Sequence, residues 1–184
     1  LLNEERLEVP RHVMVQVAEP TRESVIGYSE IRDRVDGLVG VVNGAYGLVG
    51  QPAINYLHRS QSIEELVALY LAADVMLVTP VRDGMNLVCK EFIAARTDDT
   101  GVLVLSEFTG AAEALGSALL INPYDTDGLK NAIDRAVHLP EADVRRRMEL
   151  LRESVMTNDV YAWAHSWMVA LGIESEHGDD GAPS

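Results

Sequence analysis

Short apolar segments alternate with longer helical patterns along most of this sequence, and that alternation sharply limits the folds available to it. Apolar runs rich in β-forming residues occupy positions 12–18, 54–57, 75–78, 101–105 and 118–121. Continuous apolar strands of this kind are typical of parallel sheets whose faces are both covered by helices. The sequence therefore predicts the α/β class, with a parallel sheet and helices on both of its faces.

Helical patterns fill the segments between these runs. They cover residues 22 to about 42, 62–72, 86 to about 96 and 110–115, and a further helix follows 122–125 and ends near residue 137. Thr21 is a candidate N-cap for the first helix, and Ser62 with Glu65 has the spacing of a capping box. The dipeptide Asn43-Gly44 is typical of a turn, so we expect the first helix to end before it.

The pattern changes at Pro140, after which the sequence predicts two helices with no strand between them. These helices cover residues 141–156 and 160–171. The last residues are small, polar and acidic, a composition typical of a disordered terminus. We therefore expect a sheet domain at 1–139, C-terminal helices at 140–172 and a disordered acidic tail at 173–184.

The balance of charge argues against some classes of partner. The net charge is −14, and Lys90 and Lys130 are the only lysines, which disfavours non-specific binding of nucleic acid or of an anionic membrane surface. No apolar run has the length of a membrane span, and no signal peptide is evident. The single cysteine, Cys89, suits a reducing cytoplasm. A small anionic ligand stays compatible with this composition, because helix ends and local arginines can bind phosphate.

One stretch indicates a specific chemistry. Residues 80–91 read PVRDGMNLVCKE and follow the apolar run at 75–78. This order predicts a strand, a turn containing Gly84, and a helix that begins near Asn86. Backbone N–H groups at the start of such a helix attract phosphate, and the carboxylate of Glu91 on its second turn can accept hydrogen bonds from a ribose diol. The alternative is an ordinary Asp-Gly turn followed by a simple N-cap.

The order of residues in this stretch resembles a known family. RDGMNLVCKEF is similar to the RDGMNLVAKEY signature of trehalose-6-phosphate synthases, retaining glycosyltransferases of the GT-B fold, with Cys89 where the family usually has Ala. Further stretches similar to the family stand in family order at 19–28, 43–47, 101–112 and 118–129. The resemblance covers roughly residues 10–171 and implies the Rossmann-like C-terminal domain of a GT-B enzyme, which is the donor-binding half.

The family transfers glucose from a nucleotide donor, usually UDP-glucose, to glucose 6-phosphate with retention of configuration. The resemblance implies that Leu87 and Val88 offer backbone N–H groups to the donor diphosphate. It implies that Glu91 holds the ribose hydroxyls, and that Asp83, the candidate catalytic residue, binds hydroxyls of the transferred glucose. The donor-binding residues it implies are Gln61, Asp83, Gly84, Met85, Asn86, Leu87, Val88, Cys89, Lys90 and Glu91. Arg22 matches an arginine that the family uses on the acceptor phosphate.

The resemblance also implies parts that this sequence lacks. The Arg and Lys that neutralise the donor phosphates in the family belong to an earlier segment, and this sequence begins at Leu1 without them. We therefore expect a fragment whose partner is the N-terminal half of the same enzyme, and which alone is inactive and binds nucleotide weakly. The resemblance implies that no cofactor and no essential metal is needed. The choice of UDP, ADP or GDP and the presence of a homo-oligomer are left open.

Two other functions stay open at the level of sequence. A non-catalytic or regulatory module can bind a nucleotide sugar without transferring it, and Ala45, Gln61 and Cys89 are mild departures from the family in its favour. Another GT-B enzyme, such as a glycogen synthase or a nucleotide-sugar epimerase, shares the architecture but matches RDGMN poorly.

Trp163 and Trp167 stand about one helical turn apart, a spacing more typical of a packing face than of a sugar platform.

Overall fold

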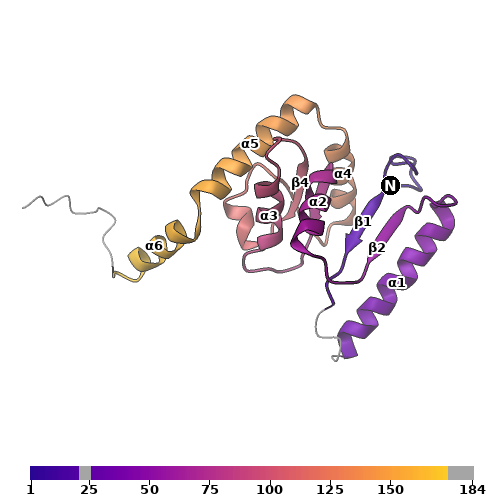
Figure 1. Ribbon diagram of the computed structural model, residues 1–184, viewed down its shortest axis with the longest axis horizontal. Coiled ribbons are helices and arrows are strands. Elements are labelled where there is room, and N and C mark those ends of the chain that lie inside the picture. The colour runs from indigo at the N-terminus through magenta and orange to yellow at the C-terminus, as the bar shows by residue number, and fades with distance from the viewer. Residues whose placement is uncertain (21–25, 174–184) are drawn as a thin grey trace, which may run out of the picture. The chain divides into compact units, whose positions relative to one another are not determined.

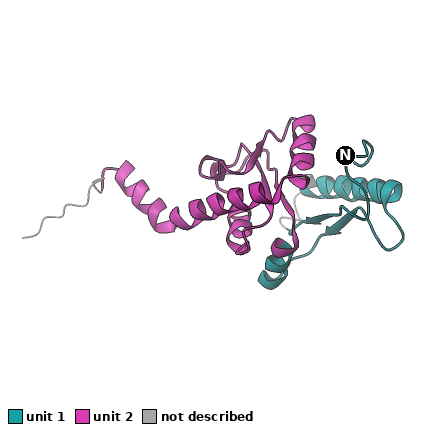
Figure 2. Cartoon of the chain, turned by 90° about the horizontal axis from the view of Figure 1, so that it is seen from above, with its two compact units in different colours: residues 1–69 teal, residues 70–184 magenta. Residues whose placement is uncertain are grey.

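The computed structural model describes residues 1–20 and 26–173, which belong to two compact units (Figure 2). Unit 1 comprises residues 1–69 and unit 2 begins at Tyr70. Arg22, Thr21 and the predicted tail from 174 onward lie outside the described residues. The separate parts that the sequence predicts at 1–139 and 140–172 stay a prediction.

Unit 1 contains a two-stranded parallel sheet and a long helix. Strand β1 (Met14–Val17) pairs with β2 (Ile54–Leu57), and Met14 lies opposite Ile54 in the register. Helix α1 (Ile26–Tyr46) connects the two strands and contacts β2. Helix α2 (Ile63–Ala72) follows β2 and contributes its first residues to this unit. The capping box predicted there is confirmed, because Ser62 N donates to Glu65 Oε2 at 2.9 Å and Glu65 N donates to Ser62 Oγ at 3.2 Å.

The predicted turn at Asn43-Gly44 is wrong, because α1 continues through both residues to Tyr46. The side chain of Asn43 is used elsewhere. Its Nδ2 donates to the carbonyl oxygen of Ile54 at 2.9 Å, and its Oδ1 accepts from the N–H of Ile54 at 2.8 Å. This pair of bonds ties the C-terminal part of α1 to the start of β2. The side-chain amide of Asn43 therefore satisfies both backbone groups of Ile54, as a neighbouring strand would, and no local turn forms.

Unit 2 holds a three-stranded parallel sheet in the order β3-β4-β5. Its elements after the end of α2 are β3 (Val75–Val78), α3 (Leu87–Ala95), β4 (Val102–Ser106), the 3₁₀ turn η1 (Gly110–Glu113), β5 (Leu119–Ile121), α4 (Thr126–Val137), α5 (Glu141–Thr157) and α6 (Val160–Ala170). The predicted α/β architecture with parallel strands is thus present, and its strands are distributed over two sheets.

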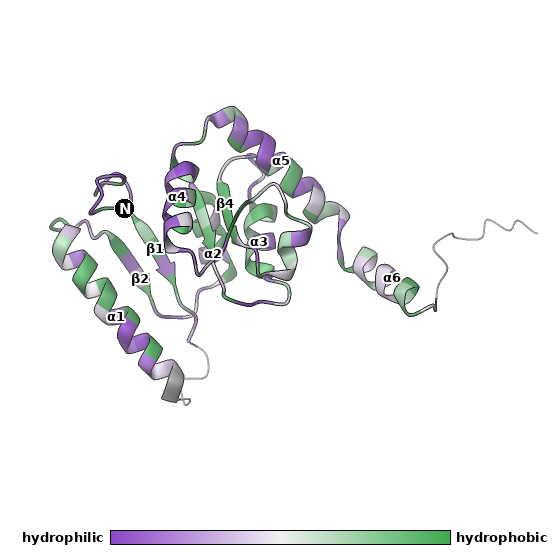
Figure 3. Ribbon diagram, turned by 180° about the vertical axis from the view of Figure 1, so that it is seen from behind, coloured by the Kyte–Doolittle hydropathy of each residue, from purple (hydrophilic) through white to green (hydrophobic). Residues whose placement is uncertain are grey.

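The core of unit 2 forms around β4, whose five residues are all buried. Figures 1 and 3 show α3 and α4 flanking β4. The strand is apolar except for its last residue, Ser106. On one face Val102 and Val104 pack with Ala136 of α4. The alternate residues of β4 point to the other face, as the pleat requires. There α3 contributes the fully buried Phe92 and contacts both β3 and α5.

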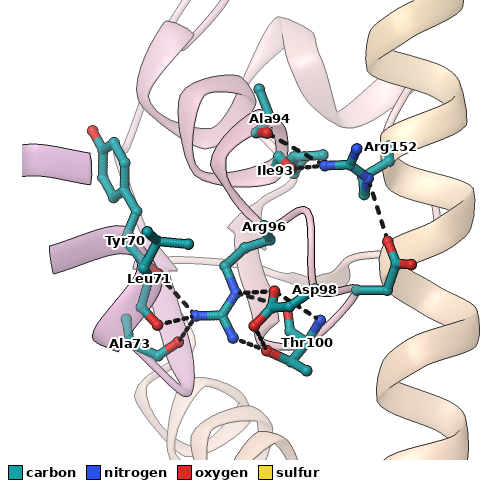
Figure 4. A network of polar contacts seen from close by, with 10 residues as sticks. Tyr70, Leu71, Ala73, Ile93, Ala94, Arg96, Asp98, Thr100 and Arg152 are labelled. Carbon is teal, nitrogen blue, oxygen red and sulfur yellow. Dashed lines mark hydrogen bonds and ion pairs between the residues drawn. The ribbon is translucent and has the colours of Figure 1, made fainter. Parts of the chain in front are cut away.

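Arg96 is a buried arginine that ties the end of α2 to the end of α3. Its Nη1 donates to the carbonyl oxygens of Tyr70 at 3.0 Å, Leu71 at 2.6 Å and Ala73 at 3.1 Å (Figure 4). Its Nε donates to Thr100 O at 3.1 Å. The last carbonyl groups of a helix lack partners within the helix, so this guanidinium satisfies them and complements the helix dipole. Only 4% of Arg96 is exposed.

The remaining helices differ in how much of their surface is buried. Helix α5 contacts α3 and β4, and its Met148 and Leu151 are buried, whereas α6 has no buried residue. Trp163 and Trp167 of α6 lie with ring centroids 6.2 Å apart, and 54% of each is exposed. Within residues 1–20 and 26–173, no helix combines the length and apolar character that a membrane crossing needs.

Candidate functional site

The signature residues lie where two loops meet beyond the carboxyl ends of β3 and β4. The N–H of Asp83 donates to Phe108 O at 3.2 Å, and the N–H of Gly110 donates back to Asp83 O at 3.0 Å. The N–H of Ala111 donates to Met85 O at 3.1 Å. These bonds hold the loop that follows β3 against the loop that follows β4. In open parallel sheets this edge is where ligands bind.

Gly110 allows this close approach, and the sequence reasoning did not single it out. A Cβ atom at position 110 would overlap the carbonyl oxygen of Gly84. The adjacent loops can therefore touch only if residue 110 has no side chain. The signal available in the sequence was a glycine shortly after a buried strand, inside the family-like stretch at 101–112.

Asp83 is held in a fixed orientation by its own loop. Its Oδ1 accepts from the N–H of Met85 at 3.1 Å, and its Oδ2 accepts from Nδ2 of Asn86 at 2.9 Å. The bond from Met85 and then the bond from Asn86 lower the pKa of Asp83, since both stabilise its charged form. Asp83 is half-buried, so its carboxylate is both ionised and accessible. A carboxylate in this state can accept hydrogen bonds from sugar hydroxyls.

Asn86 joins the loop to α3. The predicted N-cap is present: Asn86 Oδ1 accepts from the N–H of Cys89 at 2.9 Å. Because its Nδ2 donates to Asp83, one amide caps the helix and orients the carboxylate. The backbone of Asn86 has φ of 71°, a left-handed conformation that asparagine tolerates better than most residues. The backbone conformation of the loop and the orientation of Asp83 therefore both depend on the asparagine at position 86.

The first two N–H groups of α3 are available to a ligand. Asn86 caps the N–H of Cys89, whereas the N–H groups of Leu87 and Val88 have no hydrogen-bond partner among the described residues. Leu87 and Val88 are 60% and 42% exposed. Unpaired N–H groups at a helix start carry partial positive charge and bind anions. These are the two residues predicted to contact a diphosphate, and that contact stays a prediction.

Glu91 lies on the surface of α3 with a partner that the sequence analysis missed. Its Oε2 accepts from the hydroxyl of Tyr70 at 3.0 Å. Burial and then the bond to Glu91 raise the pKa of Tyr70 to about 12, so its hydroxyl keeps its proton. Tyr70 lies in α2, 21 residues from Glu91 in sequence, and no local pattern connects the two.

The other signature side chains take different positions. Cys89 is fully buried, and this burial raises the pKa of its thiol to about 11. It is therefore a packing residue whose thiol is not a nucleophile. Lys90 is half-buried, while Met85 is 42% exposed beside Gly84, which is also exposed.

Gln61 and Arg22 are the two predicted site residues that do not belong to unit 2. Gln61 belongs to unit 1, where its Nε2 donates to Arg59 O at 3.0 Å just before α2. Arg22, the predicted acceptor residue, lies outside the described residues. In the described part of the chain, no three His, Cys, Asp or Glu residues are grouped so that they could hold a metal ion.

Known proteins share both this sequence and this fold. The family model of glycosyltransferase family 20 matches residues 1–172. The chain belongs to glycosyltransferase family 20. A trehalose-6-phosphate synthase from Mycolicibacterium smegmatis is 50% identical to it over 181 residues, which are 98% of this chain and 36% of that protein. The chain thus spans about a third of the length of the curated relatives it matches.

Solved members of the family have the same fold. A UDP-forming α,α-trehalose-phosphate synthase from Burkholderia xenovorans, in complex with glucose-6-phosphate, matches with a TM-score of 0.81 and 39% identity, over 86% of this chain and 35% of that one. An E. coli structure bound with UDP-2-fluoro glucose matches with a TM-score of 0.82 and 38% identity, over 89% of this chain and 37% of that one. The predicted family and fold class are confirmed.

Proposed function

We propose that this chain is the donor-binding part of a retaining glucosyltransferase. The complete enzyme would transfer glucose from UDP-glucose, or another nucleotide glucose, to glucose 6-phosphate and release trehalose 6-phosphate. The observation that carries the proposal is the start of α3, where the unpaired N–H groups of Leu87 and Val88 lie in sequence between the carboxylates of Asp83 and Glu91. The relatives support it, because they are UDP-forming or bind UDP-2-fluoro glucose and glucose-6-phosphate.

Each part of the donor has a matching group in this site. The diphosphate would accept from the N–H groups of Leu87 and Val88, helped by the positive end of the helix dipole. The ribose diol would donate to Glu91, and hydroxyls of the transferred glucose would donate to Asp83. Gly84 and Met85 are exposed beside Asp83, where they can close over the sugar.

The charge of the site indicates what the rest of the enzyme must provide. Asp83 and Glu91 add negative charge close to a diphosphate that is itself an anion. As glucose leaves, the nucleoside diphosphate gains further charge, and stabilising that charge requires preorganised donors or cations. We assign these cations, together with the remainder of the acceptor pocket, to the part of the enzyme that this chain does not span. Arg22 is our candidate for the acceptor phosphate. The complete enzyme would work in the reducing cytoplasm, which suits the buried free thiol of Cys89.

The experiment is product analysis with the complete enzyme. It is incubated with UDP-glucose labelled with ¹³C at the anomeric carbon and with glucose 6-phosphate, and the product is examined by NMR. The proposal predicts α,α-linked trehalose 6-phosphate and stoichiometric UDP. Release of free glucose would indicate hydrolysis, and binding of UDP-glucose without any product would indicate a non-catalytic module. Either result would overturn the transferase proposal.

A further inference from the structure

Tyr70 presents its hydroxyl to Glu91 from a rigid position in the core. Only 6% of Tyr70 is exposed. Its ring meets the ring of Phe92 edge-on, with centroids 6.3 Å apart and planes at 80°. Phe92 is itself fully buried. The phenol ring therefore has little freedom, and its hydroxyl lies 3.0 Å from Oε2 of Glu91.

The backbone of Tyr70 is fixed as well as its ring. Arg96 donates to the carbonyl oxygen of Tyr70 at 3.0 Å and to the two carbonyl oxygens of Leu71 and Ala73 (Figure 4). Arg96 is 4% exposed, so these bonds form in a region that excludes most water. The tyrosine is thus held at both ends before any ligand binds, and the hydroxyl position does not depend on the donor.

Glu91, in contrast, is an exposed side chain that would sample several rotamers without a partner. Freezing such a side chain on ligand binding costs free energy. The bond from Tyr70 removes much of that cost in advance, because it fixes one carboxylate oxygen. Oε1 of Glu91 has no partner among the described residues and can accept from a ligand.

We propose that Tyr70 is a positioning residue that holds Glu91 ready for the ribose diol of the nucleotide donor. The inference rests on the proposed donor site and adds a residue to it from another element, α2. It also explains how the site would select a ribonucleotide donor over a 2′-deoxyribonucleotide donor. A diol can bind a pre-oriented carboxylate through both hydroxyls, whereas a 2′-deoxyribose keeps only one of these bonds.

The test compares Tyr70→Phe with the parent in the complete enzyme. Phenylalanine keeps the ring that packs on Phe92 and removes only the hydroxyl. We expect the KM for UDP-glucose to rise about tenfold, the size expected for losing one hydrogen bond to a charged group. The kcat and the KM for glucose 6-phosphate should change little. The ratio of kcat/KM for UDP-glucose over 2′-deoxy-UDP-glucose should fall.

Tyr46→Phe is the matched control, because it removes a hydroxyl that bonds to Asn3 Oδ1 in unit 1. Its KM values and the deoxy-donor ratio should equal those of the parent. A double-mutant cycle with Glu91→Ala adds a second readout, because alanine leaves the hydroxyl of Tyr70 no side-chain acceptor at position 91. Once Glu91 is changed, removing the hydroxyl of Tyr70 should have little further effect on the donor KM.

The possible outcomes separate the inference from the proposed function. If Tyr70→Phe leaves the donor KM and the deoxy-donor ratio unchanged while the parent makes trehalose 6-phosphate, the positioning role is overturned and the function stands. Equal losses in kcat and both KM values, or strictly additive effects in the cycle, also overturn it. If the parent enzyme forms no product, the proposed function itself fails.

Discussion

Asp83 and Asn86 hold each other in the loop that leads into α3. The amide of Asn86 donates to the carboxylate of Asp83 and accepts from the N–H of Cys89. The carboxylate also accepts from the N–H of Met85. A charged group that is already oriented loses less free energy when a ligand arrives. We therefore expect these residues to preorganise the proposed donor site before a sugar binds.

Replacing Asp83 by Asn should disable the enzyme without unfolding it. The new amide would direct N–H groups toward the amide of Asn86 and would accept more weakly from glucose hydroxyls. We expect kcat/KM for transfer to fall about a hundredfold, as for loss of a charged hydrogen-bonding partner that acts in the transition state. Asp127→Asn is the control, since this aspartate is an exposed partner of Lys130 on α4. Near-normal kcat/KM in Asp83→Asn would remove Asp83 from the site.

Asp83 should also make the stability of the 184-residue chain depend on pH. Hydrogen bonds from Met85 and Asn86 lower its pKa in the folded protein. The stability it adds is therefore fully present above the ordinary pKa of an aspartate, about 3.9, and is lost as the pH falls through the lower folded value. Urea unfolding at neutral and acidic pH should show a steeper acid loss for the parent than for Asp83→Asn. Equal losses in the two proteins would contradict the assignment.

At the scale of elements, the site depends on two loops that must touch. The loop after β3 exchanges backbone hydrogen bonds with the loop after β4, and Gly110 provides the space for the carbonyl of Gly84. This contact fixes the loop that leads into α3, and it uses only backbone atoms of the signature residues. Glycines outside the signature can therefore be as important to donor binding as the residues within it.

Gly110→Ala should weaken donor binding by moving the two loops apart. The added methyl group would overlap the carbonyl oxygen of Gly84, which would break the bond between Gly110 N and Asp83 O. We expect a rise of about tenfold or more in the donor KM of the complete enzyme, together with a lower melting temperature. The control is Gly116→Ala, because a Cβ there would meet no atom within 4 Å. Matching KM values for both alanine variants would show that the loop contact is not needed.

The strands and the start of α3 could be predicted because their signals are local. Strands β2 and β3 coincide with the apolar runs at 54–57 and 75–78, and Asn86 caps α3 as its residue type suggests. The end of α1 could not be predicted, because the side chain of Asn43 forms hydrogen bonds with Ile54 of β2, which is distant in the sequence. The hydrogen bond between Tyr70 and Glu91 could not be predicted either, because it joins two helices that come together only in the folded chain.

At the scale of the whole molecule, the chain covers about a third of the length of its relatives. The start of α3 and its loop supply backbone N–H groups and two carboxylates. A diphosphate next to carboxylates needs positive charge, and we propose that the remainder of the complete enzyme contributes it. Donor binding by this part is therefore expected to be weak in isolation.

The purified 184-residue chain should show no transferase activity. Without further cations the leaving UDP would not be stabilised, so a coupled assay of UDP release with UDP-glucose and glucose 6-phosphate should give only the background rate. The complete enzyme, assayed in parallel, is the positive control. UDP release by the chain alone that depends on glucose 6-phosphate would show that this part contains a whole active site.

A crystal structure of the complete enzyme with UDP-2-fluoro glucose would show directly whether the start of α3 binds the donor. We expect diphosphate oxygens about 3 Å from the N–H groups of Leu87 and Val88. We also expect the ribose diol on Glu91 and glucose hydroxyls on Asp83. A donor bound with its diphosphate away from the start of α3 would show that the donor site lies elsewhere.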